Sequence, residues 1–208
     1  MNYSNIEQIC KEYRIENYTI NQDGTVDVDR NVNLSNKKLT RLPLKFGKVS
    51  GDFYCNDNQL TTLEGCPTEV GGDFYCSYNK LTTLEGCPKT VGGDFYCNDN
   101  QLTTLEGCPT EVGSFDCSSN QLTIINWNDV YLLNTNNFYL EDNPIYEVYK
   151  LFPDFKTFKD SLEWNYFRKP NIIFKERFVE ACGILEEETG KNIIVPEKIK
   201  GYIFEWNT

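Results

Sequence analysis

The nine cysteines are the residues of this chain with the greatest potential for covalent or metal chemistry. Thiols at regular spacing can form disulfides or bind zinc. However, the chain has no histidine and no C-x-x-C pair, so the usual zinc-ligand spacings are missing. We interpret the cysteines as small apolar core residues, since free cysteine is among the most buried residue types. Seven of them recur at fixed places in a repeated sequence: Cys55, Cys76, Cys97, Cys117, Cys66, Cys87 and Cys108.

The sequence lacks the residues that most enzymes use for catalysis. Histidine, the commonest general base, is missing. The sequence contains neither a nucleophile elbow nor a phosphate-binding glycine loop, and the Gly pairs at 71–72 and 92–93 belong to the repeat. Recurring aspartates could bind calcium, but they do not form the clustered loop of a calcium site. We therefore expect no enzymatic activity, no cofactor and no bound metal.

A repeat of 21 residues organises the middle of the chain. Residues 51–71 recur letter for letter at 93–113, with a near copy between them and a looser copy after them. A period in the twenties is typical of stacked units, none of which can bury its apolar face alone. The sequence therefore predicts a solenoid in which residues one period apart become neighbours.

Each repeat predicts a short strand, a turn and a return segment. In the unit F-x-C-x-x-N-x-L, apolar residues such as Phe74 and Cys76 alternate as in a strand with one buried face. Asn79 is predicted to turn the chain, because its side chain can bond to nearby backbone groups, and stacked copies would form an asparagine ladder. Pro88 and the Gly pair at 92–93 exclude a long helix on the return. Cysteines stacked in register would point the same way, so we expect no disulfides.

The pattern resembles the leucine-rich repeat, L-x-x-L-x-L-x-x-N-x-L, with Phe and Cys at two of the Leu positions. The short period and the L-x-x-L-x-x-x-P turn are similar to the bacterial short-repeat subtype. The resemblance implies an α/β fold, a right-handed leucine-rich repeat solenoid with a parallel sheet on its concave side and an extended convex side. We expect about six rungs within residues 31–146. The first has Lys37 in the asparagine place, and the last contains Asn143.

Both ends of the solenoid are expected to carry caps, because a terminal rung meets no copy on one side. Residues 1–30 predict an N-terminal cap with a helix over 5–15 and a hairpin around the Asp-Gly turn at 23–24. Residues 147–208 predict a helical C-terminal cap with a closing strand near 203–206. The first helix should bury Phe155, Phe158, Leu162 and Tyr166. The second should follow Asn171, end at Gly190 and bury Phe174, Phe178, Val179, Cys182 and Leu185.

The outward residues of the predicted strands would form a concave surface that faces a partner. An acidic column beside an aromatic column suits a basic peptide or protein, because tyrosine supplies contact area and aspartate selects for positive charge. A second interpretation stays open, since identical columns can also be copies left by duplication on a solvated strand face. The candidate binding residues are Asp52, Tyr54, Asp73, Tyr75, Tyr78, Asp94, Tyr96 and Asp116.

The charge of the chain limits the classes of partner. The net charge is −11, and residues 1–150 contain 21 Asp/Glu against 11 Lys/Arg. Such a surface repels nucleic acid, because binding to phosphates depends on cations. The sequence has no apolar run of about 18 residues that could span a membrane, and its N-terminal residues lack the apolar stretch of a secretion signal. We expect a cytoplasmic protein that binds neither nucleic acid nor a membrane.

The sequence favours a monomeric, non-enzymatic module for protein–protein interaction. Its LTTLEGCP and GGDFYC segments and its NPIYEVYKLFP junction look like leucine-rich repeat proteins of tailed bacteriophages. That resemblance implies a phage protein that acts on a host factor in the host-cell cytoplasm. Two alternatives stay open. One is a self-assembling structural or virion-associated protein. The other is an inhibitor that binds a small ligand where the repeats meet the C-terminal helices, near Trp127, Trp164 and Trp206.

Overall fold

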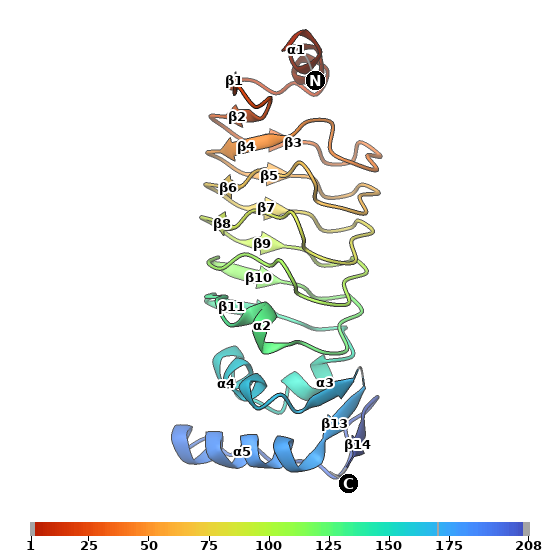
Figure 1. Ribbon diagram of the computed structural model, residues 1–208, viewed down its shortest axis with the longest axis vertical. Coiled ribbons are helices and arrows are strands. Elements are labelled where there is room, and N and C mark those ends of the chain that lie inside the picture. Colours follow the sequence, from red (N-terminus) through yellow and green to blue (C-terminus); the bar gives the residue numbers. More distant parts are fainter. Residues whose placement is uncertain (1–2, 170, 206–208) are drawn as a thin grey trace.

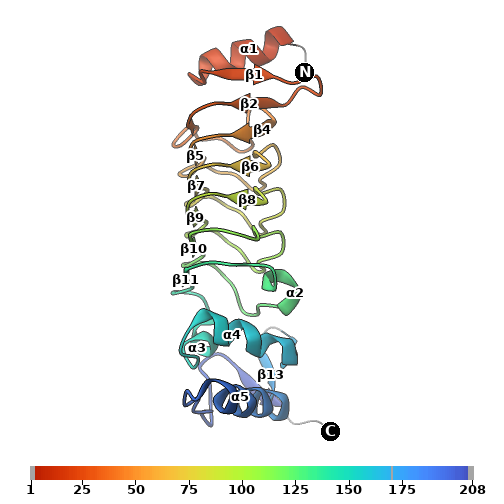
Figure 2. The same ribbon diagram turned by 90° about the vertical axis from the view of Figure 1, so that its left-hand side faces the viewer.

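The computed structural model describes residues 3–169 and 171–205. The chain winds into a β-solenoid of stacked coils, with a helix and a hairpin at one end and a mainly helical segment at the other (Figure 1). Figures 1 and 2 show the coils following one another along the long axis of the molecule. One continuous core of buried side chains extends from Ile6 to Tyr202. The predicted mixed α/β solenoid is confirmed.

Six strands form the larger sheet, and five turns of chain join them. All neighbours in this sheet are parallel and in register, so that Phe53 lies beside Phe74 and Tyr54 lies beside Tyr75. The 21-residue period therefore becomes the step between neighbouring strands, as predicted. The strands are β3 (Val32–Asn33), β5 (Phe53–Tyr54), β7 (Phe74–Tyr75), β9 (Phe95–Tyr96), β10 (Ser114–Asp116) and β11 (Asn137–Tyr139).

The return side of the coils forms a second sheet, which we did not predict. Its order is β1-β2-β4-β6-β8, with β1 antiparallel to β2 and the other pairs parallel. Within the repeats, each return strand has only one buried residue, Val70 in β6 and Val91 in β8, so the sequence showed no alternation there and indicated only an extended return. The strands are β1 (Tyr18–Ile20), β2 (Val26–Val28), β4 (Phe46–Val49), β6 (Glu69–Val70) and β8 (Thr90–Val91).

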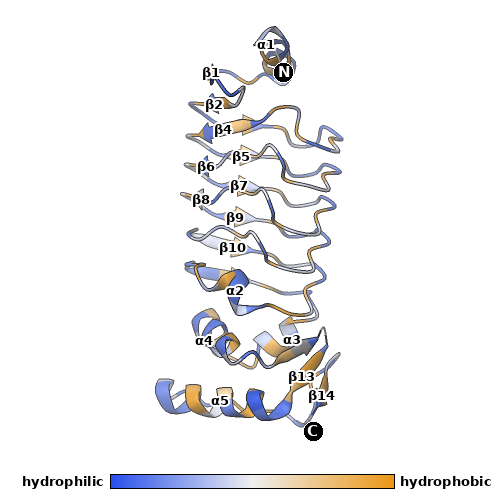
Figure 3. Ribbon diagram, viewed as in Figure 1, coloured by the Kyte–Doolittle hydropathy of each residue, from blue (hydrophilic) through white to orange (hydrophobic). Residues whose placement is uncertain are grey.

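The inward side chains form regular stacks between the two sheets. Five phenylalanine rings lie one above another with centroids 5.1–5.7 Å apart. Figure 3 shows short apolar stretches alternating with polar turns along the coils. All nine cysteines are free thiols, and all are buried except Cys108, which is half-buried. Their prediction as core residues is therefore confirmed. The stacked rings are Phe53, Phe74, Phe95, Phe115 and Phe138.

A ladder of asparagines connects each coil to the one before it. The Asn79 side chain is buried, and its Oδ1 accepts a hydrogen bond from the backbone N–H of Leu60 at 2.9 Å. Its Nδ2 donates to the carbonyls of Cys55 and Cys76, both at 3.0 Å. The amide thus satisfies backbone groups of two coils at once, which confirms the predicted ladder. The same pattern recurs at Asn58, Asn100, Asn120 and Asn143.

The N-terminal end agrees with the predicted helix and hairpin, with a change of bounds. Helix α1 (Tyr3–Glu12) ends before position 15, and Arg14 lies in the left-handed region with φ 56°. Ile6 and Cys10 point from this helix into the core. Strands β1 and β2 pair as the predicted antiparallel hairpin.

The C-terminal segment differs from the prediction in several residues. Tyr166 is buried but follows the first helix rather than belonging to it, Phe174 ends a strand, and Val179 is 44% exposed. Gly190 ends the last helix with φ 66°, and Ile203 and Phe204 lie in a closing strand, both as expected. Trp206 lies outside the described residues. The elements are α2 (Trp127–Val130), α3 (Tyr146–Tyr149), α4 (Phe155–Ser161), the 3-10 helix η1 (Leu162–Trp164), β12 (Phe167–Lys169), β13 (Ile172–Phe174), α5 (Lys175–Thr189) and β14 (Ile203–Glu205).

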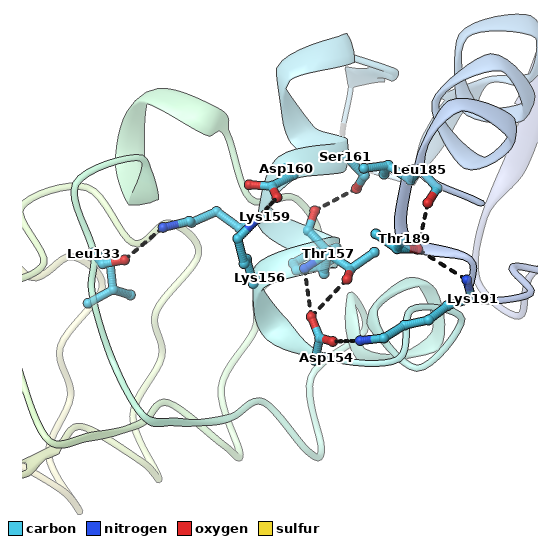
Figure 4. Close-up of polar contacts among 11 residues, drawn as sticks. Leu133, Asp154, Lys156, Thr157, Lys159, Asp160, Ser161, Leu185, Thr189 and Lys191 are labelled. Atoms are coloured by element: carbon cyan, nitrogen blue, oxygen red, sulfur yellow. Dashed lines mark hydrogen bonds and ion pairs between the residues drawn. The ribbon is translucent and has the colours of Figure 1, made fainter. Parts of the chain in front are cut away.

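Polar contacts connect this segment to the coils and to itself (Figure 4). Lys159 of α4 donates from Nζ to the carbonyl of Leu133, 2.9 Å away, in the last coil. Asp154 caps α4, because its Oδ1 accepts from the backbone N–H of Thr157 at 2.8 Å. The other Asp154 oxygen pairs with Lys191, which follows α5. Helix α4 is therefore bonded to the last coil through Lys159 and to the residue that follows α5 through its cap, Asp154.

Glycine at position 92 is required by the stacking of the coils. A Cβ at Gly92 would lie 2.3 Å from the carbonyl oxygen of Gly71 in the preceding coil. Because neither backbone can move without breaking the sheet, Gly92→Ala should lower the free energy of unfolding by about 1–3 kcal/mol. Gly183 of α5 is the matched control, since a Cβ there meets nothing within 4 Å. Gly183→Ala should stabilise by about 0.5–1 kcal/mol. Equal denaturation midpoints for the two variants would contradict this account.

Candidate partner-binding face

The eight candidate residues lie on one outward surface, which we call the tyrosine face. Seven of them lie on or next to strands of the larger sheet, and the eighth lies in the turn that follows β7. The seven residues on or next to the strands alternate with the buried phenylalanines and cysteines, so the parity of the predicted strands is correct. The face consists of Asp52, Tyr54, Asp73, Tyr75, Tyr78, Asp94, Tyr96 and Asp116.

Three tyrosines form a stack along this face. The rings of Tyr54 and Tyr75 have centroids 4.7 Å apart and planes within 6° of parallel. Tyr75 and Tyr96 repeat this arrangement at 4.7 Å and 5°. The in-register strands set this spacing, because neighbouring strands lie about 4.8 Å apart. The stack ends at Tyr96, because Asp116 occupies the equivalent place in β10.

Each stacked tyrosine is bonded to the aspartate two residues before it. The hydroxyl of Tyr54 donates to Asp52 Oδ2 at 2.9 Å, and Tyr75 donates to Asp73 Oδ2 at the same distance. Tyr96 donates to Asp94 in the same way, at 3.0 Å. The phenol groups of the stack are therefore already paired within the protein.

The same aspartates connect successive coils through their second oxygen. Asp52 Oδ1 accepts from the backbone N–H of Asp73 at 2.9 Å, and Asp73 Oδ1 accepts from that of Asp94 at 2.8 Å. Asp94 Oδ1 accepts from the N–H of Ser114 at 2.7 Å. Charge-assisted bonds of this kind are stronger than neutral ones. The acidic column therefore has a structural role that the sequence did not reveal.

Burial and the aspartates together raise the pKa of the stacked phenols. Desolvation is the larger cause for Tyr96, and the hydrogen bond and negative charge of Asp94 add to it, which raises the pKa of Tyr96 to about 12. The pKa of Tyr75 is raised by the same causes, with Asp73 as its partner. These tyrosines are neutral hydrogen-bond donors over the physiological pH range.

Tyr78 has a different environment from the stacked tyrosines. Its side chain is 55% exposed, and its backbone lies in the left-handed region with φ 53°. Asp57 and Asp99 occupy the same turn position in the coils before and after it, with φ 55° and 54°. Aspartate tolerates this conformation, whereas it costs a larger residue about 1–2 kcal/mol. The charge of Asp99 is the main cause that raises the pKa of Tyr78, and Asp57 contributes less.

In the coils next to Tyr78, equivalent asparagine and serine side chains differ in their hydrogen bonds. Ser77 donates its hydroxyl to Asn98 Oδ1 at 2.5 Å. Asn56 Oδ1, one coil earlier, is buried and has no hydrogen-bond partner. Asp116 accepts from the N–H and the hydroxyl of Ser118, at 3.0 and 2.6 Å. Asp116, which occupies the place of a stacked tyrosine, therefore bonds to the turn of its own coil.

The candidate binding residues left out three residues of this surface, although the repeat places Asp57 and Asp99 in the same outward column as Tyr78. Asn31 is the first member of the aspartate column, since its Oδ1 accepts from the N–H of Asp52 at 2.9 Å. Asp57 and Asp99 flank Tyr78 and complete its surroundings. Of the three, only Asn31 was missed altogether, and the 21-residue period could have found it because Asn31 is one period before Asp52.

The thiols offer no reactive site among the described residues. Cys55, Cys76 and Cys97 are fully buried in the core. Desolvation raises the pKa of Cys108 to about 12, with a smaller effect from the charge of Asp129. Within residues 3–169 and 171–205, no group of three or more cysteine or acidic side chains is arranged to hold a metal ion.

A small cavity lies at the place suggested for a small ligand. It has a volume of about 350 Å³ and lies beside Trp127 and Leu162, between the last coil and the C-terminal segment. Asn126, Glu163 and Asn165 are among its lining residues. Trp164 does not line it, and Trp206 is outside the described residues. The lining of this cavity is largely polar, unlike the apolar pockets typical of small-ligand sites.

Comparison with known proteins identifies no relative of this chain: no family profile, no curated protein and no solved structure matches it. Among the described residues, no helix is both long and apolar enough to cross a lipid bilayer.

The hydroxyl of Tyr96 should titrate near pH 12 instead of near the ordinary value of about 10. Because the folded protein favours the protonated phenol, its contribution to stability is present below about pH 10 and is lost as the pH rises through about 12. Tyrosinate absorbance of the wild type minus that of Tyr96→Phe isolates this titration. Asp94→Asn should move it to lower pH, and an unchanged curve in that variant would contradict the assigned cause.

Native protein should leave its nine thiols unmodified by a disulfide exchange reagent at mildly alkaline pH, since burial suppresses the reactive thiolate. After unfolding in guanidinium, all nine should react. Mass spectrometry of peptides identifies the order of labelling, and we expect Cys108 to react first because it is the least buried. Rapid labelling of Cys76 or Cys97 in native protein would show that the coils open.

Proposed function

We propose that this protein is a non-enzymatic interaction module that binds a basic peptide, or a basic segment of a partner protein, on the tyrosine face. The observation that supports this function best is Tyr78. It is an exposed aromatic ring in a conformation that disfavours it, placed between Asp57 and Asp99. Residues held in unfavourable backbone conformations are concentrated at functional sites. Aspartate would relieve the strain, as it does in the neighbouring coils.

The surroundings of Tyr78 suit a positively charged side chain. A lysine or arginine over an exposed aromatic ring gains about 0.5–1 kcal/mol from the cation–π interaction. Asp57 and Asp99 lie one coil to either side, which places them about 10 Å apart across the tyrosine at the usual strand spacing. A guanidinium or ammonium group between them can therefore contact a ring and a carboxylate together. The stacked Tyr54, Tyr75 and Tyr96 extend this surface with rigid aromatic area.

The charge of the coils supports the same class of partner. Residues 49–150 contain 15 Asp/Glu and only three Lys/Arg. A surface with one sign of charge attracts partners of the other sign and raises their association rate, an effect that salt weakens. Because the aspartates of the column are already bonded within the fold, we assign them this long-range role. We assign close recognition to Tyr78 and to Asp57 and Asp99, each of which accepts a hydrogen bond from the asparagine before it in its own coil, Asn56 or Asn98, at 2.6 and 2.7 Å.

We further propose that the solenoid is a right-handed leucine-rich repeat of the bacterial short-repeat subtype. The asparagine ladder and the extended returns support this assignment. On this proposal the protein is a monomer of the cytoplasm, similar to leucine-rich repeat proteins of tailed bacteriophages, and it acts on a host factor.

Selection of ligands from a random-peptide display library tests the proposal. Wild-type protein should enrich peptides rich in lysine and arginine. Tyr78→Ala should weaken a selected peptide about tenfold or more, because a central aromatic contact is commonly worth about 1.4 kcal/mol or more. Tyr131→Ala is the matched control, since Tyr131 is 49% exposed on α2's C-terminal side and away from the face. Equal weakening by both variants would count against the tyrosine face.

The two carboxylates can be tested without disturbing the turn. Asparagine tolerates the left-handed conformation as aspartate does, and its amide oxygen can still accept from Asn56 or Asn98, so Asp57→Asn with Asp99→Asn removes the charge and keeps an acceptor. This double variant should weaken the same basic peptide and make its affinity less dependent on salt. Unchanged affinity and an unchanged salt dependence would remove these residues from the site.

A further inference from the structure

The first coil carries a charge opposite to that of the coils that follow it. Residues 30–48 contain six Lys/Arg and no Asp/Glu, whereas residues 49–150 contain three Lys/Arg and 15 Asp/Glu. The segment lies between β2 and the end of β4. A repeat protein that copies its units exactly would carry acidic residues here too. The cations are Arg30, Lys37, Lys38, Arg41, Lys45 and Lys48.

Only part of this positive charge is neutralised by neighbouring coils. Lys45 pairs with Glu64 at 3.5 Å, and Lys48 pairs with Glu69 at 2.8 Å. Lys37, Lys38 and Arg41 are exposed and form no ion pair within residues 3–169 and 171–205. A cluster of free cations therefore remains at this edge of the first coil.

Two of these cations, Lys38 and Arg41, border a cavity between α1 and the first return segment. The cavity has a volume of about 590 Å³, within the range of about 300–1,000 Å³ that is typical of ligand sites. Its apolar lining comes from α1 and from the leucines of the return. Lys38, Arg41 and Lys45 belong to the same lining, and Glu64 is its one acidic member among the described residues. We call this cavity the basic pocket; its apolar residues are Ile9, Tyr13, Leu39, Leu42, Pro43 and Leu44.

We propose that the basic pocket docks a short acidic segment of a partner protein. An apolar side chain of the segment enters among Ile9, Tyr13 and Leu42. The carboxylates that flank it pair with Lys38 and Arg41. Arginine and lysine at the edge of an apolar pocket bind carboxylates well, because the surrounding apolar surface excludes water from the ion pair.

The charge pattern explains why a short peptide fits better than a larger anion. Glu64 and Glu69 begin the acidic surface one coil away, about 5 Å along the axis. A duplex or an anionic membrane would extend across those acidic coils and be repelled by them. A peptide with two or three carboxylates can stay within the first coil. The pocket is distinct from the tyrosine face and opposite in charge, so the protein would connect an acidic partner to a basic one.

The same random-peptide selection tests the basic pocket. Wild-type protein should enrich a second group of peptides, in which Asp or Glu flanks a large apolar residue. Lys38→Glu with Arg41→Glu should weaken these peptides about tenfold or more and leave the basic peptides of the tyrosine face unaffected. Lys198→Glu with Lys200→Glu is the matched control, because both lysines are exposed in the C-terminal segment. Melting curves of both double variants should match the wild type.

Further measurements separate the possible occupants. Replacing the apolar residue of a selected acidic peptide by serine should also abolish binding, since charge alone does not fill the pocket. Equal affinity of acidic peptides for both double variants, or no enrichment of acidic peptides, would overturn the proposal. Preferred binding of phosphatidylserine vesicles or a single-stranded oligonucleotide would overturn it as well. A concentration-dependent dimer that Lys38→Glu with Arg41→Glu abolishes would make a second copy the occupant and reject a separate partner.

Discussion

Hydrogen bonds from asparagine and aspartate side chains to the backbone of a neighbouring coil are the interaction on which this structure depends. A solenoid turns sharply at its corners, and backbone groups at a corner lose the partners that a longer strand would provide. At one corner, Asn79 and its equivalents satisfy carbonyls and an N–H of two coils. At another corner, Asp73 and its equivalents accept the N–H of the next coil. Both bonds join residues close to one period apart, so they set the register of every column.

That register has consequences for packing and for the surface. Inside, it stacks phenylalanine rings and buried thiols, which form one core along the molecule. Outside, it stacks tyrosines whose hydroxyls bond the same aspartates that join the coils. Much of the tyrosine face is therefore part of the fold. The residues free to recognise a partner are those that depart from the repeat, such as Tyr78 on the face and Lys38 and Arg41 in the first coil.

Several features could be predicted because they depend on local chemistry or on the period alone. The repeat indicated stacked strands, Asn79 and its copies indicated the ladder, and Gly190 indicated the end of a helix. Other features could not, because they arise from pairing between distant segments. The second sheet consists of strands of two to four residues, and β6 and β8 within the repeats have only two residues each. Residues 172–174 were assigned to the helix that follows Asn171, yet they form β13, since isoleucine and phenylalanine favour strands and Ile203 and its neighbours pair with them.

The sequence alone determined that copies of one unit stack in register, since a 21-residue repeat can bury its apolar residues only against another copy. It also determined the parity of the strands and hence which side chains face outward. Only the tertiary structure decided which outward residues are hydrogen-bonded within the fold and which are exposed. A hydrogen bond between two coils depends on how their turns are placed along the axis of the solenoid. In the folded chain, the aspartates of the column accept hydrogen bonds from neighbouring coils, and Tyr78 is exposed between two carboxylates. The tertiary structure also places α1 against the first return segment, where Lys38, Arg41 and Lys45 border a pocket.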